Sequence, residues 1–232
     1  MTPLPDPEAL GALLVAGVEP PLAERLAVYA AVVLAANRRV NLTGAKDGTA
    51  FAGHILDALT LRADVRSPLV DVGSGNGLPG IVLAFATGAR VTLVEAIKKR
   101  AAFLADAMRA LDIDGEVVAE RAEDAARAPL HREAYATATA RAVGSAPAVA
   151  ELTVPLLAVG GRALLQRGSI EPSERDAVAD AALVLGAELV DERPLGGGRS
   201  ILILEKQSPT SARFPRKNGM PAKRPLCVSV SR

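Results

Sequence analysis

Hydrophobic residues follow two different patterns along the 232-residue chain. Over residues 6–64 they recur every three or four positions, which predicts amphipathic helices. Over residues 69–205, short apolar runs alternate with helical patterns, which predicts strands joined by helices. We therefore divide the chain into an N-terminal helical cap (1–66), an α/β core (67–206) and a C-terminal arm (207–232), within a single structural domain overall.

The core pattern predicts a mainly parallel sheet with helices on both faces. Strands are expected at 69–72, 91–95, 116–119, 135–140, 161–166, 187–191 and 200–205, and helices at 78–87, 98–110, 145–158 and 172–185. In the cap, helical spacing covers 10–18, 22–36 and 49–61. The last two strands join across Arg193–Gly198, which leaves no room for a helix, so we expect them to form an antiparallel hairpin.

The segment 69–80 reads Leu-Val-Asp-Val-Gly-Ser-Gly-Asn-Gly-Leu-Pro-Gly and joins a predicted strand to a predicted helix. Glycine lets a ligand approach the backbone closely, and a helix start offers unpaired N–H groups, so this turn is typical of a nucleotide-type site. Residues 75–80 alone also fit the dinucleotide fingerprint. The wider frame, with Asp71 two residues before Gly73, resembles the first motif of class I S-adenosylmethionine-dependent methyltransferases.

A carboxylate, Glu95, ends the second predicted core strand. An acid at this place accepts both ribose hydroxyls of a nucleoside, which NAD and S-adenosylmethionine share, so Glu95 does not separate the two cofactors. The C-terminal hairpin does separate them, because a dinucleotide-binding sheet continues with a helix there. We expect an α/β fold of the class I methyltransferase (Rossmann-like) type, with the helical cap ahead of the sheet.

Two further segments follow strands and so reach the same edge of the sheet. Glu120–Asp124 comes after the third strand, beside the expected adenine, where Glu123 and backbone N–H groups are candidates to read the ring. Arg141 comes after the fourth strand, and its planar guanidinium fits a methionine carboxylate or an RNA phosphate. The alternatives are a solvated charged loop and a surface ion pair.

Composition limits the remaining chemistry. The net charge is +1, and the single cysteine, Cys227, excludes a disulfide within the chain and a cysteine-rich metal site. His54 and His131 show no metal-ligand spacing, so no metal is expected. The start of the chain lacks a secretory signal pattern, and its longest uncharged stretch is too short to cross a bilayer. We expect a soluble, cytoplasmic protein without a membrane partner.

The C-terminal arm and the residue before it are basic and rich in proline. Residues 206–232 contain no acidic residue. The basic residues are Lys206, Arg213, Arg216, Lys217, Lys223, Arg224 and Arg232. Such an unbalanced run in a nearly neutral chain predicts contact with nucleic-acid phosphates, and Phe214 is a candidate to stack on a base.

Several stretches together carry a resemblance to a known family. They are Asn41–Thr43, His54–Asp57, Asp71–Gly80, Lys99–Arg100 before Phe103–Leu104, Arg121–Glu123, Arg141–Ala142 and Ala222–Leu226. On these residues, over about 8–226, the chain resembles the ribosomal small-subunit methyltransferase G family, also called glucose-inhibited division protein B.

The resemblance implies methyl transfer from S-adenosylmethionine to N7 of one guanosine in the decoding-centre loop of 16S rRNA. The substrate would be the small ribosomal subunit or an assembly intermediate of it. Cofactor contacts are implied for Gly73, Gly75, Leu78, Ala122, Glu123 and Arg141, with Glu95 at the ribose. Phosphate contacts are expected from Lys206, Arg213, Arg216, Lys217, Lys223 and Arg224.

Methylation at guanine N7 needs no general base, because N7 carries a free lone pair and loses no proton. No catalytic acid or base is therefore assigned. Candidates to position the guanine are Asn41, His54, Asp57 and Arg141, although from the residues alone turn, capping and helix-surface roles are favoured for the first three. A methyltransferase acting on a small molecule or protein, an NAD-dependent oxidoreductase and a non-catalytic RNA-binding module remain as alternatives.

Overall fold

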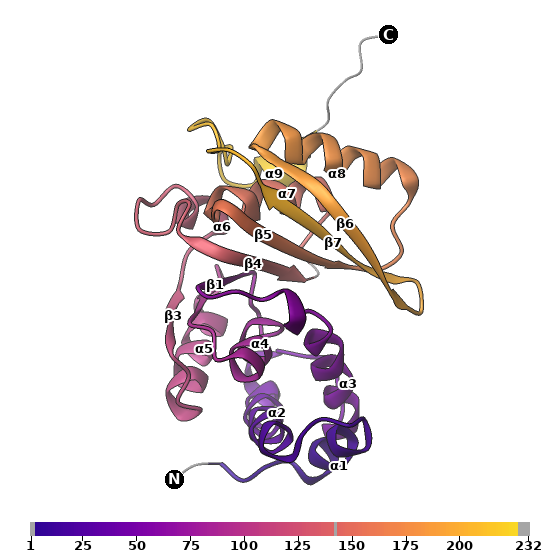
Figure 1. Cartoon of the computed structure of the whole chain (residues 1–232). Coiled ribbons are helices and arrows are strands. Elements are labelled where there is room, and N and C mark those ends of the chain that lie inside the picture. The colour runs from indigo at the N-terminus through magenta and orange to yellow at the C-terminus, as the bar shows by residue number, and fades with distance from the viewer. Residues whose placement is uncertain (1–2, 142, 227–232) are drawn as a thin grey trace.

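The computed structural model describes residues 3–141 and 143–226 and contains a seven-stranded sheet (Figure 1). The strand order is β3-β2-β1-β4-β5-β7-β6. The strands are β1 Leu69–Val72, β2 Val91–Val94, β3 Gly115–Val118, β4 Tyr135–Arg141, β5 Leu157–Arg167, β6 Ala187–Gly196 and β7 Arg199–Lys206. β1 to β5 are parallel, and β7 runs antiparallel to both β5 and β6. The mainly parallel sheet with a terminal antiparallel hairpin is confirmed.

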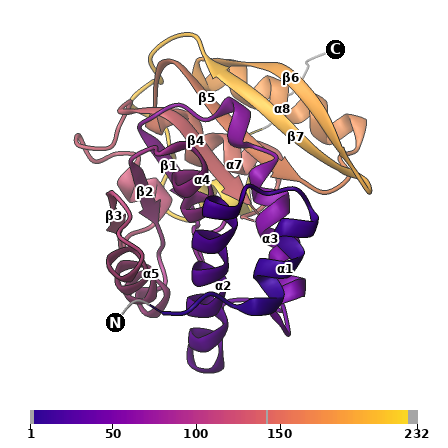
Figure 2. The same ribbon diagram turned by 60° about the horizontal axis from the view of Figure 1, so that its bottom comes forward.

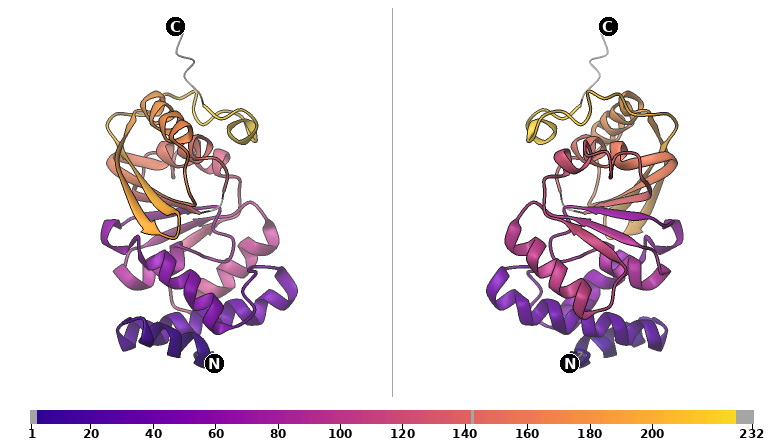
Figure 3. Two further views of the ribbon diagram at one scale, coloured as in Figure 1. Left: turned by 90° about the vertical axis from the view of Figure 1, so that its right-hand side faces the viewer. Right: turned by 90° about the vertical axis from the view of Figure 1, so that its left-hand side faces the viewer.

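Helices cover both faces of this sheet (Figure 3). On one side lie α1 Pro7–Val15, α2 Pro20–Val40, α3 Gly48–Leu59, α4 Gly80–Thr87 and α5 Lys98–Ala110. On the other lie α6 Ala122–Ala125, α7 Ala146–Thr153, α8 Pro172–Leu185 and α9 Met220–Lys223. Two short 3₁₀ turns, Arg62–Asp64 and Val154–Leu156, complete the regular elements. No helix among the described residues is long and apolar enough to cross a membrane.

The cap consists of three helices whose ends follow local signals in the sequence. Asp6 and Asp47 accept backbone N–H bonds at the starts of α1 and α3, as N-cap residues do. Asn41 ends α2 in the left-handed region, with φ 56°. Figure 2 shows α2 running between α5 and the α1–α3 pair. Through this placement the cap reaches the glycine-rich turn.

Alternation along the strands divides the core into two apolar layers. In β1, Leu69 packs with the cap, α4 and α5, whereas Val70 and Val72 pack with α7 and α8. β1, an interior strand between β2 and β4, is buried along its whole length, as expected for a parallel strand with helices on both sides. The carboxyl end of this rigid strand carries the glycine-rich turn.

Several boundaries in the core differ from the sequence-based prediction. β6 continues to Gly196 instead of ending at 191, so only residues 197–198 join it to β7, and the short helix α6 was not predicted. The helix expected over 145–158 ends at Thr153, and β5 begins at Leu157 instead of residue 161. Pro155 lacks the N–H that would continue the helix, so the chain forms a 3₁₀ turn instead. A register shift opposite Tyr135 accommodates the earlier start of β5.

Candidate active site

The turn after β1, residues 73–79, requires glycine at two positions. Gly73 has φ 71°, and a Cβ there would lie 2.8 Å from the side chain of Val143. Gly77 has φ 101°, and a Cβ there would lie 2.5 Å from Ile81. Both conformations are costly for any other residue, and both sites lack space for a side chain. Packing against Val143 and Ile81 and the positive φ angles therefore require glycine at both positions, and close approach of a ligand to this turn stays a prediction.

Asp71, in the strand before this turn, bonds to Gly80 at the start of the helix after it. Its carboxylate is fully buried and accepts hydrogen bonds from the Gly80 N–H at 3.3 Å and the Thr139 hydroxyl at 2.9 Å. Burial raises the pKa of Asp71 to about 6, although the bonds from Thr139 and Gly80 act in the opposite direction. Asp71 thereby connects β1, α4 and β4. The sequence marked it by spacing only, and its role comes from these contacts.

Glu95 lies at the end of β2, beside the turn. One carboxylate oxygen accepts the Gly75 N–H at 2.9 Å and the other accepts the Ile97 N–H at 2.7 Å. The side chain is nearly buried and lines a pocket at the carboxyl edge of the sheet. Its position at this edge agrees with a ribose-binding role, which stays a prediction.

This first pocket has a volume of about 130 Å³. It is lined by Val72, Gly73, Val94, Glu95, Ala96, Glu120, Arg121, Ala122, Glu123, Val143 and Leu152. Gly73, Glu95, Ala122 and Glu123 are thus brought together from three separate turns. Gly75 joins them through its bond to Glu95. Leu78 is buried and does not line the pocket, and Arg141 lines a different one.

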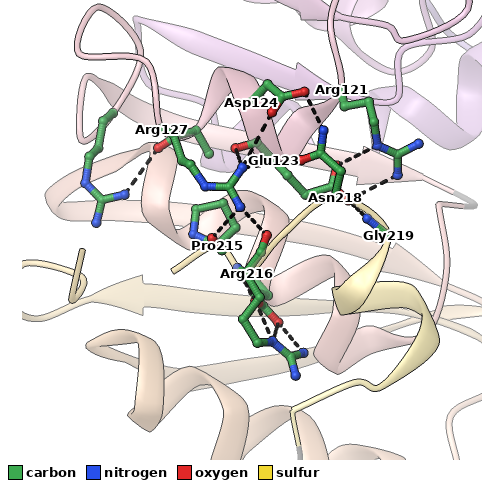
Figure 4. Close-up of polar contacts among 11 residues, drawn as sticks. Arg121, Glu123, Asp124, Arg127, Pro215, Arg216, Asn218 and Gly219 are labelled. Carbon is green, nitrogen blue, oxygen red and sulfur yellow. Dashed lines mark hydrogen bonds and ion pairs between the residues drawn. The ribbon is translucent and has the colours of Figure 1, made fainter. Parts of the chain in front are cut away.

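Glu123 forms the far wall of the first pocket. Its carboxylate accepts hydrogen bonds from Arg121 at 3.1 and 3.2 Å and from the Gly219 N–H at 2.7 Å (Figure 4). Burial opposes ionisation, but the hydrogen bonds from Arg121 and Gly219 outweigh it and lower the pKa of Glu123. The wall therefore carries a fixed negative charge held partly by the C-terminal arm.

A second pocket, of about 440 Å³, opens where α3, β4, β5 and β7 meet. It is lined by Asp57, Arg141, Gly144, Gln166, Arg167, Gly168 and Arg199. The Asp57 carboxylate lies 3.6 Å from Arg141 and 2.5 Å from Arg199. One acceptor is thus flanked by two guanidinium donors in a half-buried setting. No local pattern marks Gln166, Arg167 or Arg199 in the sequence, because their positions depend on the hairpin.

His54 lies one helical turn before Asp57 on α3, and its carbonyl oxygen lies 3.5 Å from the Arg141 guanidinium. Burial, followed by the positive charge of Arg141, lowers the pKa of His54. Its imidazole is therefore neutral at pH 7. Asn41 ends α2 and is not among the described residues that line the second pocket. The structure thus brings three of the four positioning candidates together.

Two expectations for RNA contact are wrong. Lys206 belongs to β7, is fully buried, and donates to Glu133 at 2.8 Å and the Val154 carbonyl at 3.1 Å. Burial lowers its pKa although Glu133 opposes this, and the amine cannot reach a phosphate. Phe214 is 4% exposed and packs in the apolar core, so it cannot stack on a base.

Arg216 is also engaged within the protein. It donates two-pronged hydrogen bonds at 2.6–3.0 Å to Glu151, whose side chain is fully buried. In contrast, four of the expected phosphate contacts are exposed: Arg213, Lys217, Lys223 and Arg224. Cys227 and Arg232 lie outside the described residues, as does Ala142.

Tyr29 is a further site residue that sequence reasoning missed. It is fully buried on α2, and its hydroxyl donates to the Asn76 carbonyl at 2.9 Å, so the cap supports the turn directly. The sequence marked it only as part of an apolar helix face. Among the described residues, no group of three or more His, Cys, Asp or Glu side chains is arranged to hold a metal ion.

The chain is similar to one family over most of its length. A family model described as rRNA small subunit methyltransferase G matches residues 22–200. A Rubrobacter xylanophilus protein named ribosomal RNA small subunit methyltransferase G is 43% identical over 213 residues, covering 84% of this chain and 81% of that protein. A protein of the same name from Roseiflexus castenholzii is 42% identical over 214 residues, covering 88% and 91%.

Solved structures share the fold at low sequence identity. An O-methyltransferase from Bacillus cereus in complex with SAH aligns with a TM-score of 0.55 and 17% identity, covering 77% of this chain and 90% of that one. A mutant of MtNAS in complex with S-adenosylmethionine aligns with a TM-score of 0.54 and 13% identity, covering 88% and 85%. These likenesses confirm the predicted class I methyltransferase fold.

Proposed function

The chain belongs to the rRNA small subunit methyltransferase G family, and we propose that it methylates N7 of a guanosine in the decoding-centre loop of 16S rRNA. S-adenosylmethionine supplies the methyl group as an electrophile on a sulfonium centre. We further propose that the substrate is the small ribosomal subunit or an assembly intermediate of it, in the cytoplasm. The observation that carries this proposal is the adjacency of the two pockets: Val143 lines the first, and Gly144 lines the second.

The first pocket has the donors and acceptors that the cofactor needs. Gly73 has no Cβ that would keep the cofactor away from the backbone. Glu95 offers carboxylate oxygens for the ribose hydroxyls. Ala122 and Glu123 line the wall expected beside the adenine. These four residues come from the ends of β1, β2 and β3, where ligands bind in open α/β sheets.

The second pocket is suited to a guanine edge. Guanine presents N–H donors at N1 and N2 and an acceptor at O6. Asp57 offers the matching acceptor, while Arg141 and Arg199 offer donors. His54, which is uncharged at pH 7, lies on the same helix face and adds no charge that would repel a purine acquiring positive charge.

The proposed reaction relies on positioning. N7 attacks with its own lone pair, so no side chain has to remove a proton. What the protein contributes is alignment of N7 with the methyl group and exclusion of water, which together account for a large share of the rate in such reactions. Asp57 and Arg141, which fix each other, are proposed as the residues that orient the base.

A labelling experiment tests the proposal. The protein is mixed with radiolabelled S-adenosylmethionine and small ribosomal subunits that lack the modification, and the rRNA is digested to nucleosides. We expect label in 7-methylguanosine, and loss of most label for Glu95→Ala but not for Arg109→Ala, an exposed helix residue. Label in a different nucleoside, or none despite tight cofactor binding, contradicts the proposal.

A further inference from the structure

The C-terminal arm contacts the wall of the first pocket, although the two segments lie far apart in the sequence (Figure 4). We call residues 120–127 the wall segment. Glu123 accepts the Gly219 N–H at 2.7 Å, and Asp124 accepts an amide N–H of Asn218 at 2.6 Å. These bonds join a pocket-lining carboxylate to a segment about 95 residues away.

Arg127 is the centre of this connection. Its guanidinium donates to the carbonyl oxygens of Pro215, at 2.9 Å, and Arg216, and to the Asn218 side chain at 3.3 Å. It also donates to the carbonyl oxygen of Glu123 at 3.2 Å. The Arg127 side chain therefore connects three residues of the arm to Glu123, which lines the pocket.

The arm is anchored to the core independently of the wall. Arg216 binds the buried carboxylate of Glu151 on α7, and Phe214 is buried beside it. Arg132 donates to the carbonyl oxygens of Thr210 at 2.7 Å and Phe214 at 2.8 Å. Residues 217–224 lie beyond this anchor and include the contacts to Glu123 and Asp124, and Arg216 also donates to the Arg224 carbonyl at 2.6 Å.

That same part of the arm carries exposed positive charge. Lys217 directly precedes the Asn218–Gly219 peptide, and Lys223 and Arg224 follow within five residues of it. All three side chains are exposed, and the arm has no acidic residue. These cations therefore lie close in sequence to the peptide that donates to Glu123.

We propose that the arm couples rRNA docking to cofactor binding: its exposed cations bind rRNA phosphates, and its Asn218–Gly219 peptide, with Arg127, positions the wall beside the cofactor. This inference rests on the proposed function for the identity of the polyanion. Arg127 and Asn218 are positioning residues, since they act through Glu123. Because coupling between two binding sites is reciprocal, each ligand raises the affinity for the other by the same factor.

We expect the coupling to be favourable because bound rRNA restricts the conformational freedom of the arm. Docked rRNA holds residues 217–224 against the wall segment, so a cofactor that then binds has less conformational freedom left to restrict. We therefore expect small subunits to tighten cofactor binding by about fivefold or more, the lower end of usual coupling factors. Salt should weaken the effect, because the phosphate contacts are electrostatic.

The test measures the dissociation constant of S-adenosylhomocysteine, which cannot react, with and without saturating unmodified small subunits. For the unaltered protein the ratio of the two constants should be about five or more. Arg127→Met and Asn218→Ala each remove part of the connection, while the Gly219 N–H bond to Glu123 and the cations Lys217, Lys223 and Arg224 stay in place. For both variants we expect a ratio clearly below that of the unaltered protein, with subunit affinity measured without cofactor unchanged.

Arg109→Met is the matched control, since Arg109 is an exposed arginine on α5 whose guanidinium pairs with Asp106, away from the wall segment and the arm. It should keep the full ratio. Hydrogen exchange gives a second readout: in the unaltered protein, subunits and S-adenosylhomocysteine should each slow exchange of the Gly219 amide. Arg127→Met could have a much lower melting temperature than the unaltered protein. In that case the test rests on Asn218→Ala, because the Asn218 side chain is exposed and its loss should not unfold the chain.

A ratio near one for the unaltered protein overturns the inference, as does a full ratio in both variants. Failure of the proposed function looks different. In that case no label enters 7-methylguanosine, whatever the binding ratio. A fivefold ratio without methylation would support the coupling and reject the reaction, whereas methylation with a ratio of one would do the reverse.

Discussion

The hydroxyl of Tyr29, in the middle of α2, donates a hydrogen bond to the carbonyl oxygen of Asn76 in the glycine-rich turn. The two residues are 47 positions apart in the chain, and the tyrosine ring is fully buried. Phe51 of α3 packs edge-on against that ring at 5.6 Å. The cap therefore supports the glycine-rich turn through α2 and contributes Asp57 of α3 to the second pocket.

Replacing Tyr29 with Phe removes this hydrogen bond without changing the packing. We expect cofactor affinity to fall by about 2- to 10-fold, which corresponds to the roughly 0.5–1.5 kcal/mol of one buried hydrogen bond. Titration calorimetry with S-adenosylhomocysteine measures the change. Tyr135→Phe is the control, because Tyr135 bonds to His131 away from the turn. Equal affinities for the two variants would contradict a supporting role for Tyr29.

Asp71 gives the protein a defined dependence on pH. The pKa of its carboxyl is about 6 in the folded chain, above the roughly 3.9 of an unfolded aspartate. The folded state then binds the extra proton between about pH 4 and pH 6, so the contribution of Asp71 to stability is fully present below pH 4 and is lost as the pH rises through 6. The loss is at most about 3 kcal/mol.

Urea unfolding of the unaltered protein and Asp71→Asn, from about pH 4 to pH 7, tests this dependence. The free energy of unfolding of the unaltered protein should fall relative to that of the variant across this interval. Asp106→Asn serves as the control, since Asp106 is a largely exposed helix residue. Parallel curves for Asp71→Asn and the unaltered protein would show that Asp71 titrates as an ordinary aspartate.

Gly73 should not tolerate a side chain. In Gly73→Ala the new Cβ meets Val143 at 2.8 Å and the backbone has φ 71°, so either the turn or the segment after β4 must shift. We expect cofactor affinity to fall by about tenfold or more and stability to fall by about 1–2 kcal/mol. Gly11→Ala is the comparison, because no atom lies within 4 Å of its Cβ position and it lies within α1. That change should leave affinity unaltered and stabilise the helix slightly.

Asp57→Asn should separate base positioning from cofactor binding. The isosteric amide weakens the pairing with Arg141 and Arg199, so the second pocket loses its fixed arrangement of donors and acceptor. We expect single-turnover methylation of small subunits to slow by about 10- to 100-fold, the usual effect of misplaced groups, while S-adenosylhomocysteine affinity stays within about twofold.

Asp64→Asn is matched to this change, because Asp64 is similarly shielded and pairs with Arg193 outside both pockets. It should leave the methylation rate close to normal. An Asp57→Asn protein with the full rate would remove Asp57 from the list of positioning residues, and one with weakened cofactor binding would place its effect in the first pocket.

Local sequence signals were sufficient for the sheet and for the turn. The glycines at 73–80, the carboxylate after β2 and the short connection between the last two strands each act within a few residues. The structure contains the turn and the hairpin, although β6 continues to Gly196 and the connection is only residues 197–198. The end of α7 was also marked by a local signal, although the prediction placed it too late in the chain. Pro155 was present as a stop signal, but the apolar run around it obscured the change from helix to strand.

Tertiary structure decided which polar residues are exposed and which are paired inside the protein. Lys206 and Lys217 lie 11 positions apart in the same basic segment, yet one is buried against Glu133 and the other is exposed. Likewise, Arg199 reaches Asp57 across 142 residues, and Gly219 reaches Glu123 across 96. Periodicity and turn chemistry record only neighbours along the chain, whereas desolvation and charge pairing depend on segments that packing brings together. The sequence by itself therefore determined the class of fold and the glycine-rich turn, and the packing determined the second pocket and the attachment of the arm.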